Sequence, residues 1–134
     1  MTSRPFSLMH VRAPGKVNLA LSVGPRREDG YHDLATVFMA VSLSEELHAH
    51  SAAEFSVGYT GPIDTSALTG DDTLVHRAAR MIADELTPAR RAELGVDDLP
   101  GLRIVVEKHV PIAGGMGGGS ADAAAALLAC DKAW

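Results

Sequence analysis

Residues 111–122 have the sequence Pro111-Ile112-Ala113-Gly114-Gly115-Met116-Gly117-Gly118-Gly119-Ser120-Ala121-Asp122. Five of the 13 glycines lie in this segment, which follows the apolar, β-branched run 102–107 and precedes the alanine- and leucine-rich run 123–129. A strand, a glycine loop and a helix in this order present backbone N–H groups to an anion. Glycine allows the positive φ angles that turn those groups inward, and the helix start adds partial positive charge. The segment therefore predicts a phosphate-binding loop.

Two common phosphate-loop signatures do not fit this segment. A P-loop would end in Gly-Lys-Ser or Gly-Lys-Thr, and no lysine follows these glycines. The G-x-G-x-x-G pattern of dinucleotide-binding folds fails because its third glycine would fall at Ser120. A flexible linker is the remaining alternative, but such linkers are not set between an apolar strand and an alanine-rich helix.

The composition is that of one globular domain with an aliphatic core. The chain has 134 residues, of which 46% are hydrophobic and only 4% aromatic. Its net charge of −5 argues against a surface for nucleic acid or membrane. No apolar run approaches the ~20 residues of a membrane span, and the N-terminus lacks a signal core, which predicts a cytoplasmic protein. The single cysteine, Cys130, is predicted to be a small buried residue.

Hydrophobic periodicity predicts strands first and helices later. Residues 16–23 alternate as in a strand, with four apolar side chains expected on one face: Val17, Leu19, Leu21 and Val23. The other predicted elements are a strand over 36–43, a weaker antiparallel pair over 47–50 and 55–59, helices over 73–86 and from 88 to near 95, a strand over 102–110, and a helix over 120–134. This order predicts a layered α+β domain.

The two longer predicted helices differ at their ends. Asp71, Asp72 and Thr73 precede the first and are predicted to cap it. The last helix has neither a glycine cap nor a trailing proline, and the sequence stops at Trp134 within an apolar stripe. Because such a face needs cover, we expect a partial chain.

Three segments, taken in order, resemble the GHMP kinase superfamily. They are Ala-Pro-Gly-Lys-Val-Asn-Leu at 13–19, Asp-Gly-Tyr-His at 29–32 with Thr-Val-Phe at 36–38, and the glycine loop. The resemblance extends over essentially the whole chain, but only over the N-terminal part of such an enzyme. Within the superfamily it is similar to the branch that uses ATP and Mg²⁺ to phosphorylate the 2-hydroxyl of 4-diphosphocytidyl-2-C-methyl-D-erythritol, in the non-mevalonate pathway of isoprenoid biosynthesis.

The resemblance implies the two-layer α+β fold of a GHMP kinase N-terminal domain, with a mixed or antiparallel sheet and helices packed on one face. It implies that residues 1–134 are the ATP- and substrate-binding domain and that the C-terminal domain is absent. The family's catalytic aspartate lies in a Gly-x-Asp-Val-Pro-like segment, and none occurs before Trp134. We therefore expect this chain alone to be inactive.

The resemblance also implies the roles of individual residues. Lys16 matches the active-site lysine, Asn18 the polar residue beside the acceptor, and Tyr31 and His32 the pair that holds the cytidine base. Ser120 is expected near phosphate or Mg²⁺. The expected contacts with ATP are Lys108, Pro111, Ile112, Ala113, Gly114, Gly115, Met116, Gly117, Gly118, Gly119, Ser120 and Ala121. These roles suit phosphoryl transfer, which needs positioning and charge neutralisation more than covalent help.

Simpler interpretations exist for each residue taken alone. Lys16 would be a solvated lysine at a strand end, and Tyr31-His32 would be a turn pair that binds no ligand. As a functional alternative, the tyrosine ring can stack on a base and the histidine imidazole can bind the polar edge of that base. Thr73 precedes Leu74 where relatives carry Asn near the adenine, so an adenine contact there is in doubt. The five other histidines lack metal-ligand spacing.

Two alternative functions stay open at this point. The first is another GHMP enzyme, such as a homoserine or mevalonate-type kinase, against which the Tyr31-His32 pair and the triple glycine at 117–119 speak. The second is a non-catalytic nucleotide-binding module, because the chain lacks the aspartate. The expected partners are ATP and the small-molecule substrate, with no nucleic acid and no membrane, and with a homodimer allowed.

Overall fold

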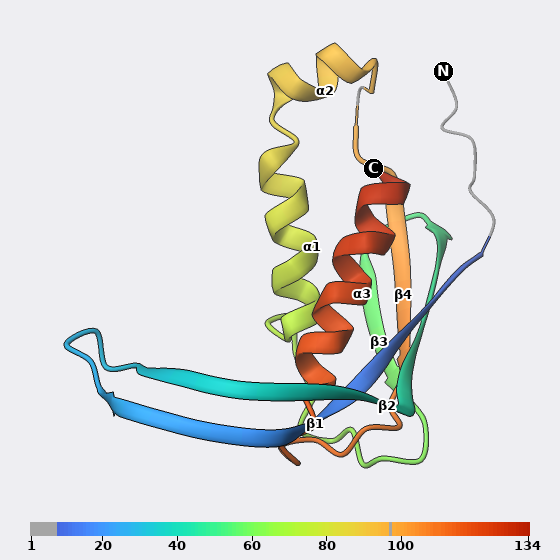
Figure 1. Cartoon of the computed structure of the whole chain (residues 1–134). Coiled ribbons are helices and arrows are strands. Elements are labelled where there is room, and N and C mark those ends of the chain that lie inside the picture. The colour runs from blue at the N-terminus through green and yellow to red at the C-terminus, as the bar shows by residue number, and fades with distance from the viewer. Residues whose placement is uncertain (1–7, 97) are drawn as a thin grey trace.

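The computed structural model describes residues 8–96 and 98–134. The described elements are β1 (Met9–Arg26), β2 (His32–Ala52), β3 (Ser56–Thr60), α1 (Leu74–Glu85), α2 (Pro88–Leu94), β4 (Gly101–Glu107) and α3 (Gly118–Ala133). Two helices, α1 and α3, lie side by side on one face of a single sheet (Figure 1). The expected α+β architecture, with a mixed sheet and helices on one face, is confirmed.

The sheet has the strand order β1-β2-β4-β3, with β2 antiparallel to β1 and β4, and β3 parallel to β4. The predicted pairing of residues 47–50 with 55–59 is therefore wrong, because β4 lies between these segments. Three alternate residues of β4 are fully buried: Leu102, Ile104 and Val106. An apolar strand of this kind buries the most apolar surface in the interior of the sheet. Periodicity along the chain does not reveal which strands are interior.

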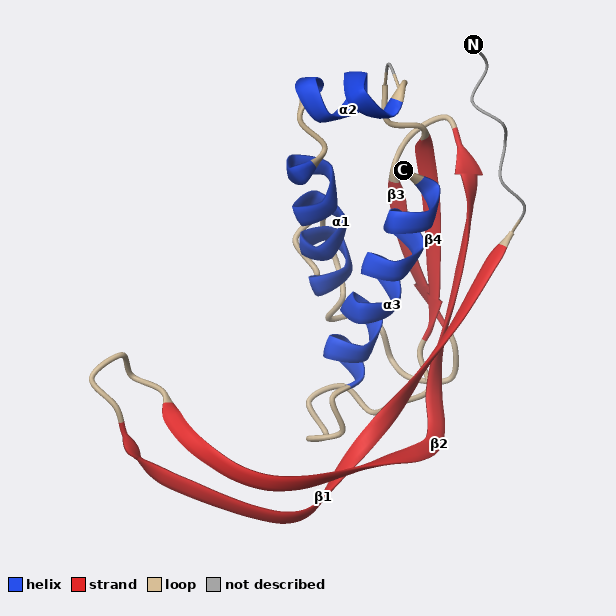
Figure 2. Ribbon diagram, turned by 45° about the horizontal axis from the view of Figure 1, so that its top comes forward, coloured by secondary structure: helices blue, strands red, loops and turns tan. Residues whose placement is uncertain are grey.

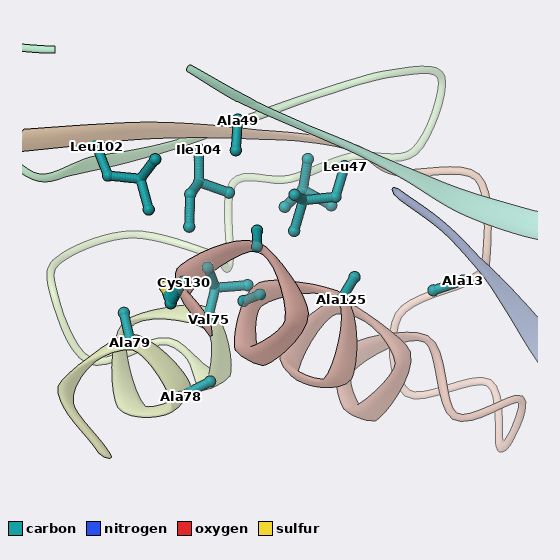
Figure 3. Close-up of a cluster of buried hydrophobic side chains, with 13 residues drawn as sticks. Ala13, Leu47, Ala49, Val75, Ala78, Ala79, Leu102, Ile104, Ala125 and Cys130 are labelled. Atoms are coloured by element: carbon teal, nitrogen blue, oxygen red, sulfur yellow. The ribbon is translucent and has the colours of Figure 1, made fainter. Parts of the chain in front are cut away.

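The core lies between the sheet and the two helices, and Figure 3 shows how its side chains meet. Leu47 and Ile104 project from the sheet toward Val75 of α1 and Cys130 of α3. The helix surfaces in this core are mostly alanine, at positions 78, 79, 125, 126 and 129, so the two helices and the sheet pack closely. Cys130 is buried as a free thiol, as predicted, and burial raises its pKa to about 11.

The hairpin of β1 and β2 is longer than predicted, and its distal half projects away from the body (Figure 2). The strand register shifts between Asn18 and Ala20, so Val17 lies opposite Met39 whereas Leu21 lies opposite Thr36. Met39 and Thr36 are three residues apart on β2 and face opposite sides of it. Val17 and Leu21 therefore do not share a face, and the predicted alternation is wrong because of this bulge.

The end of α2 agrees with the sequence-based prediction, whereas the start of α1 differs from it. α2 ends as predicted at Gly95, which has a left-handed φ of 69°. At the start of α1, by contrast, Thr73 occupies the N-cap position without a capping side-chain hydrogen bond. Asp72 instead binds the side chains of Arg77 and Arg80, which holds the pKa of Asp72 below its usual range. Thr73 therefore has the predicted N-cap position, but the expected capping hydrogen bond is absent because its hydroxyl bonds Tyr59 and His76.

Candidate functional site

The glycine loop connects β4 to α3 and carries three positive φ angles, at Ala113 (57°), Gly115 (74°) and Gly117 (72°). The positive φ at Ala113 is a conformation that a residue with a side chain rarely adopts. The loop, the first turn of α3, Leu68 and Leu74 line a pocket of about 320 Å³. Open backbone at a helix start suits this pocket to an anion, and the phosphate-binding role expected from the sequence stays a prediction.

Lys16 of β1 lies against this loop. Its backbone N–H donates to the carbonyl of Met116 over 2.9 Å, and its Cγ and Cε would lie 3.4 and 3.5 Å from a Cβ added at Gly117. Next to Lys16, a Cβ at Gly15 would lie 3.3 Å from the Leu43 carbonyl oxygen, which leaves little room for a side chain. The fold thus brings two segments together that are about 100 residues apart in the chain, as the resemblance implies.

The ammonium of Lys16 is held by neighbouring side chains on the hairpin. Lys16 Nζ donates to Asn18 Oδ1 over 2.7 Å, and Asn18 Nδ2 donates to Thr36 Oγ1 over 2.8 Å. The ring centroid of Phe38 lies 5.0 Å from Nζ, within the range of a cation–π contact. Two predicted site residues, Lys16 and Asn18, are therefore brought together beside the loop.

Lys108 lies beneath the loop in a buried ionic cluster. Its Nζ is 2.5 Å from Glu45 Oε1 and 2.7 Å from Asp122 Oδ2, and the backbone N–H of His109 donates to Glu45 Oε2 over 2.9 Å. Burial alone would lower the pKa of Lys108, but hydrogen bonds to Asp122 and Glu45 outweigh it and raise that pKa. The ammonium points to these carboxylates, so its predicted contact with a nucleotide stays a prediction.

The two carboxylates of this cluster, Glu45 and Asp122, were not predicted as site residues from the sequence. Asp122 is 3% exposed, and burial raises its pKa to about 6 although the hydrogen bond from Lys108 opposes the change. It lies within the glycine-loop motif, so its position there was the available signal. Glu45 is fully buried and has no comparable signal, because only the tertiary fold brings β2 under the loop.

Tyr31 and His32 lie at the far end of the projecting hairpin, away from the loop (Figure 1). Ten residues of extended chain separate Lys16 from Arg26, a span of roughly 33 Å. Tyr31 is 74% exposed, and its backbone N–H is held by Asp29 Oδ1 at 3.0 Å. The Nδ1 atom of His32 lies 2.8 Å from the carbonyl oxygen of Gly24. The structure does not bring this pair to the loop, and its contact with a base stays a prediction.

A second pocket, of about 340 Å³, adjoins the loop pocket at the start of α1. The two pockets share four lining residues: Leu68, Leu74, Gly119 and Asp122. Thr73 lines the second pocket, where its hydroxyl lies 2.5 Å from the Tyr59 hydroxyl and 2.8 Å from His76 Nδ1. Burial lowers the pKa of His76, which favours its neutral form. The joined pockets form one cleft from the glycine loop to α1.

The described part of the chain has neither a side-chain cluster that could hold a metal ion nor a long apolar helix that could span a membrane. Residues 8–96 and 98–134 contain no group of three or more His, Cys, Asp or Glu side chains placed to hold a metal ion. None of the helices described is long and apolar enough to cross a membrane.

Comparison with known proteins agrees with this geometry. Residues 73–134 match the family model described as the GHMP kinases N-terminal domain. A crystal structure of 4-(cytidine 5'-diphospho)-2C-methyl-D-erythritol kinase superposes with a TM-score of 0.66 at 38% identity, over 92% of this chain and 40% of that chain. The chain thus resembles the N-terminal domain of the GHMP kinases, by the family model over residues 73–134 and by this structure over most of its length.

Curated relatives narrow the similarity further. The chain is 54% identical over 128 residues to 4-diphosphocytidyl-2-C-methyl-D-erythritol kinase of Clavibacter michiganensis, which covers 95% of this chain and 38% of the relative. It is 52% identical over 128 residues to the enzyme of the same name from Leifsonia xyli, over 94% of this chain and 39% of the relative. The chain thus spans less than two fifths of the length of these relatives. The mevalonate kinase of Methanococcus jannaschii shares the fold, with a TM-score of 0.60 at 17% identity over 94% of this chain and 40% of that chain.

Proposed function

We propose that this chain is the ATP- and substrate-binding part of a kinase that phosphorylates the 2-hydroxyl of 4-diphosphocytidyl-2-C-methyl-D-erythritol. The observation that carries the proposal is the contact between Lys16 and the glycine loop, because it places a cation beside a backbone anion site. In the reaction, the hydroxyl oxygen bonds to the γ-phosphorus of ATP, the bond from that phosphorus to ADP breaks, and the hydroxyl proton passes to a base, the role of the aspartate that these 134 residues do not supply. A lysine stabilises the negative charge on these oxygens.

The cleft would hold ATP, with the phosphates at residues 111–121 and the base in the adjoining pocket at the start of α1. Mg²⁺ is usually bound through a few protein oxygens together with substrate phosphates. Ser120 lines the loop pocket, so its hydroxyl fits a metal that arrives with the nucleotide. Mg²⁺ would neutralise phosphate charge there. Asn18 would lie beside the acceptor, and Tyr31-His32 would hold the cytidine base.

The relatives' names favour this substrate over the alternatives. The relatives at 52–54% identity carry the cytidyl-methylerythritol kinase name, whereas the mevalonate kinase similarity at 17% identity speaks for the fold alone. A cytoplasmic location, a homodimer and the need for a catalytic aspartate that these 134 residues do not supply belong to the same proposal. Turnover by this chain would exclude a non-catalytic nucleotide-binding module, whereas ATP binding without turnover agrees with both.

Replacing a glycine of the loop tests the nucleotide site. Gly117→Val should abolish ATP binding in calorimetric titration with Mg²⁺, because a branched side chain strains φ at 72° and crowds Lys16. Gly95→Val is the matched control, since Gly95 has a φ of 69° with no described atom within 4 Å of an added Cβ. The control should bind ATP as the unaltered chain does. Equal ATP affinity in both variants would contradict the loop assignment.

A further inference from the structure

A line of three hydrogen bonds runs along the hairpin from the Lys16 ammonium to a backbone carbonyl. Lys16 Nζ donates to Asn18 Oδ1 at 2.7 Å, and Asn18 Nδ2 donates to Thr36 Oγ1 at 2.8 Å. The Thr36 hydroxyl in turn donates to the carbonyl of Ala20 at 2.7 Å. Thr36 lies within neither the glycine loop nor the pockets that adjoin it.

The chemistry of these groups allows one direction for the whole line. An ammonium donates and cannot accept, so the Asn18 atom that faces Lys16 must be the amide oxygen. The amide NH₂ then faces Thr36, whose oxygen must accept. The single hydroxyl proton of Thr36 is left for the Ala20 carbonyl. The orientation of the Asn18 amide is thus set by its hydrogen bonds to Lys16 and Thr36. Thr36 in turn is held by its hydrogen bond to the backbone carbonyl of Ala20.

The strand geometry explains why Thr36 can do this. Asn18 lies opposite Phe38 in the register, and Thr36 precedes Phe38 by two residues in β2. All three side chains therefore project from the same face. A threonine has few side-chain rotamers in a strand, which holds its hydroxyl in place. Phe38 meets Lys16 from the same face, with its ring centroid 5.0 Å from Nζ.

We propose that Thr36 is a positioning residue that fixes the Asn18 amide and, through it, the Lys16 ammonium beside the glycine loop. The importance of that ammonium for phosphoryl transfer rests on the proposed function, but the positioning itself does not. Without the Thr36 hydroxyl, the Asn18 NH₂ loses its acceptor and the amide is free to rotate. The lysine then loses a fixed acceptor, and its flexible stem gains freedom.

The opposing interpretation is that Thr36 merely favours the strand. β-branched residues suit strands, and valine has the shape of threonine without the hydroxyl. Under that interpretation Thr36→Val changes nothing at Lys16. Under the proposal, Thr36→Val releases the amide, and Thr36→Ser, which keeps the hydroxyl, retains the positioning.

The composition of the chain makes Asn18 easy to observe. Asn18 is the one asparagine and the sequence has no glutamine, so an amide-detected ¹⁵N NMR spectrum holds one side-chain NH₂ pair. In the unaltered 134-residue chain, we expect these protons to exchange slowly with water. Exchange should be about tenfold faster in Thr36→Val and near the original rate in Thr36→Ser. Equal exchange in Thr36→Val and the unaltered chain would overturn the proposal.

Lys16 provides a second readout. The three lysines are Lys16, Lys108 and Lys132, and trace acetylation read by peptide mass spectrometry resolves each. We expect Thr36→Val and Asn18→Ala each to raise the rate at Lys16 about fivefold, because the amine loses the acceptor that holds it and becomes more accessible to the reagent. Exposed Lys132 should keep its rate and is the internal control.

The double variant separates positioning from a general structural effect. In Asn18→Ala, Thr36 has no amide left to hold, so adding Thr36→Val should cause no further rise at Lys16. A fully additive rise would overturn the proposal. If Thr36→Val fails to fold by circular dichroism, slow exchange of the Asn18 NH₂ protons in the unaltered chain still decides the question, and fast exchange there counts against it. Neither readout requires ATP, so these results are independent of the nucleotide-binding test.

Discussion

Lys108 is an ammonium enclosed by protein, with 1% of its surface exposed, between Glu45 and Asp122. Glu45 receives a further hydrogen bond from the backbone N–H of His109, whereas Oδ1 of Asp122 is buried without a hydrogen-bond partner among the described residues. Of the two carboxylates, Asp122 is therefore the less well compensated. A buried, incompletely paired carboxylate favours its protonated form.

This imbalance gives the stability of the chain a distinct pH dependence. Burial raises the pKa of Asp122 from 3.8 to about 6 in the folded chain. Between these values the folded state binds more protons than the unfolded state, so the contribution of Asp122 to stability is lost as the pH rises from about 4 to about 6. The loss is about 3 kcal/mol at most.

Urea denaturation of Asp122→Asn across this pH range measures that contribution. The difference in unfolding free energy between the unaltered chain and Asp122→Asn should fall with rising pH, because the amide does not titrate. Asp131→Asn, an exposed change on the same helix, should leave the pH dependence as it is. A constant difference between the unaltered chain and Asp122→Asn would show that Asp122 does not titrate in this way.

At the scale of elements, what the sequence predicts depends on how local the cause is. The unit β4–loop–α3 and the end of α2 at Gly95 follow from residues that adjoin one another, and both are confirmed. The position of β4 between β2 and β3 is a choice among distant partners, and the bulge between Asn18 and Ala20 has no residue signature. Both therefore required the tertiary structure.

The start of α3 provides a prediction about packing between elements. A Cβ at Gly118 would lie 2.7 Å from Glu45 Oε1 and 3.1 Å from Val110 Cβ. Glu45 is held by Lys108 and His109 and cannot move freely. Gly118→Ala should therefore lower the unfolding free energy by about 1–3 kcal/mol, although alanine alone favours a helix by about 1 kcal/mol.

Gly119→Ala is the matched control in the same helical turn. Its added Cβ would meet Leu74 Cδ1 at 3.2 Å, the end of a flexible side chain that is 47% exposed and can move. Urea denaturation should show Gly119→Ala close to the unaltered chain. If Gly118→Ala proved as stable as Gly119→Ala, the close packing of β2 against the start of α3 would be refuted.

For the molecule as a whole, the fold joins Lys16 to the glycine loop, but Tyr31-His32 lies at the turn between β1 and β2, at the end of the projecting hairpin (Figure 2). The sequence resemblance predicted the first pairing, because both segments carry specific motifs. The resemblance also assigned Tyr31-His32 to the cytidine base of the substrate. The length and curvature of the hairpin, which separate this pair from the loop, could not be predicted from the sequence. Several apolar side chains on this hairpin are more than half exposed: Leu19, Leu21, Val23, Leu34, Val37 and Phe38.

This arrangement leads to a prediction about the chain's activity. The cleft beside the loop is the proposed nucleotide site, whereas these 134 residues lack the Gly-x-Asp-Val-Pro-like segment that the resemblance assigns to the catalytic aspartate. We therefore expect the 134-residue chain to bind ATP without transferring phosphate to 4-diphosphocytidyl-2-C-methyl-D-erythritol. Calorimetry measures the binding, and ³¹P NMR of ATP with the substrate measures the transfer. Turnover on the order of 1 s⁻¹, as in ordinary kinases, would show that the residues present suffice for catalysis. Absence of both binding and transfer would count against the nucleotide site itself.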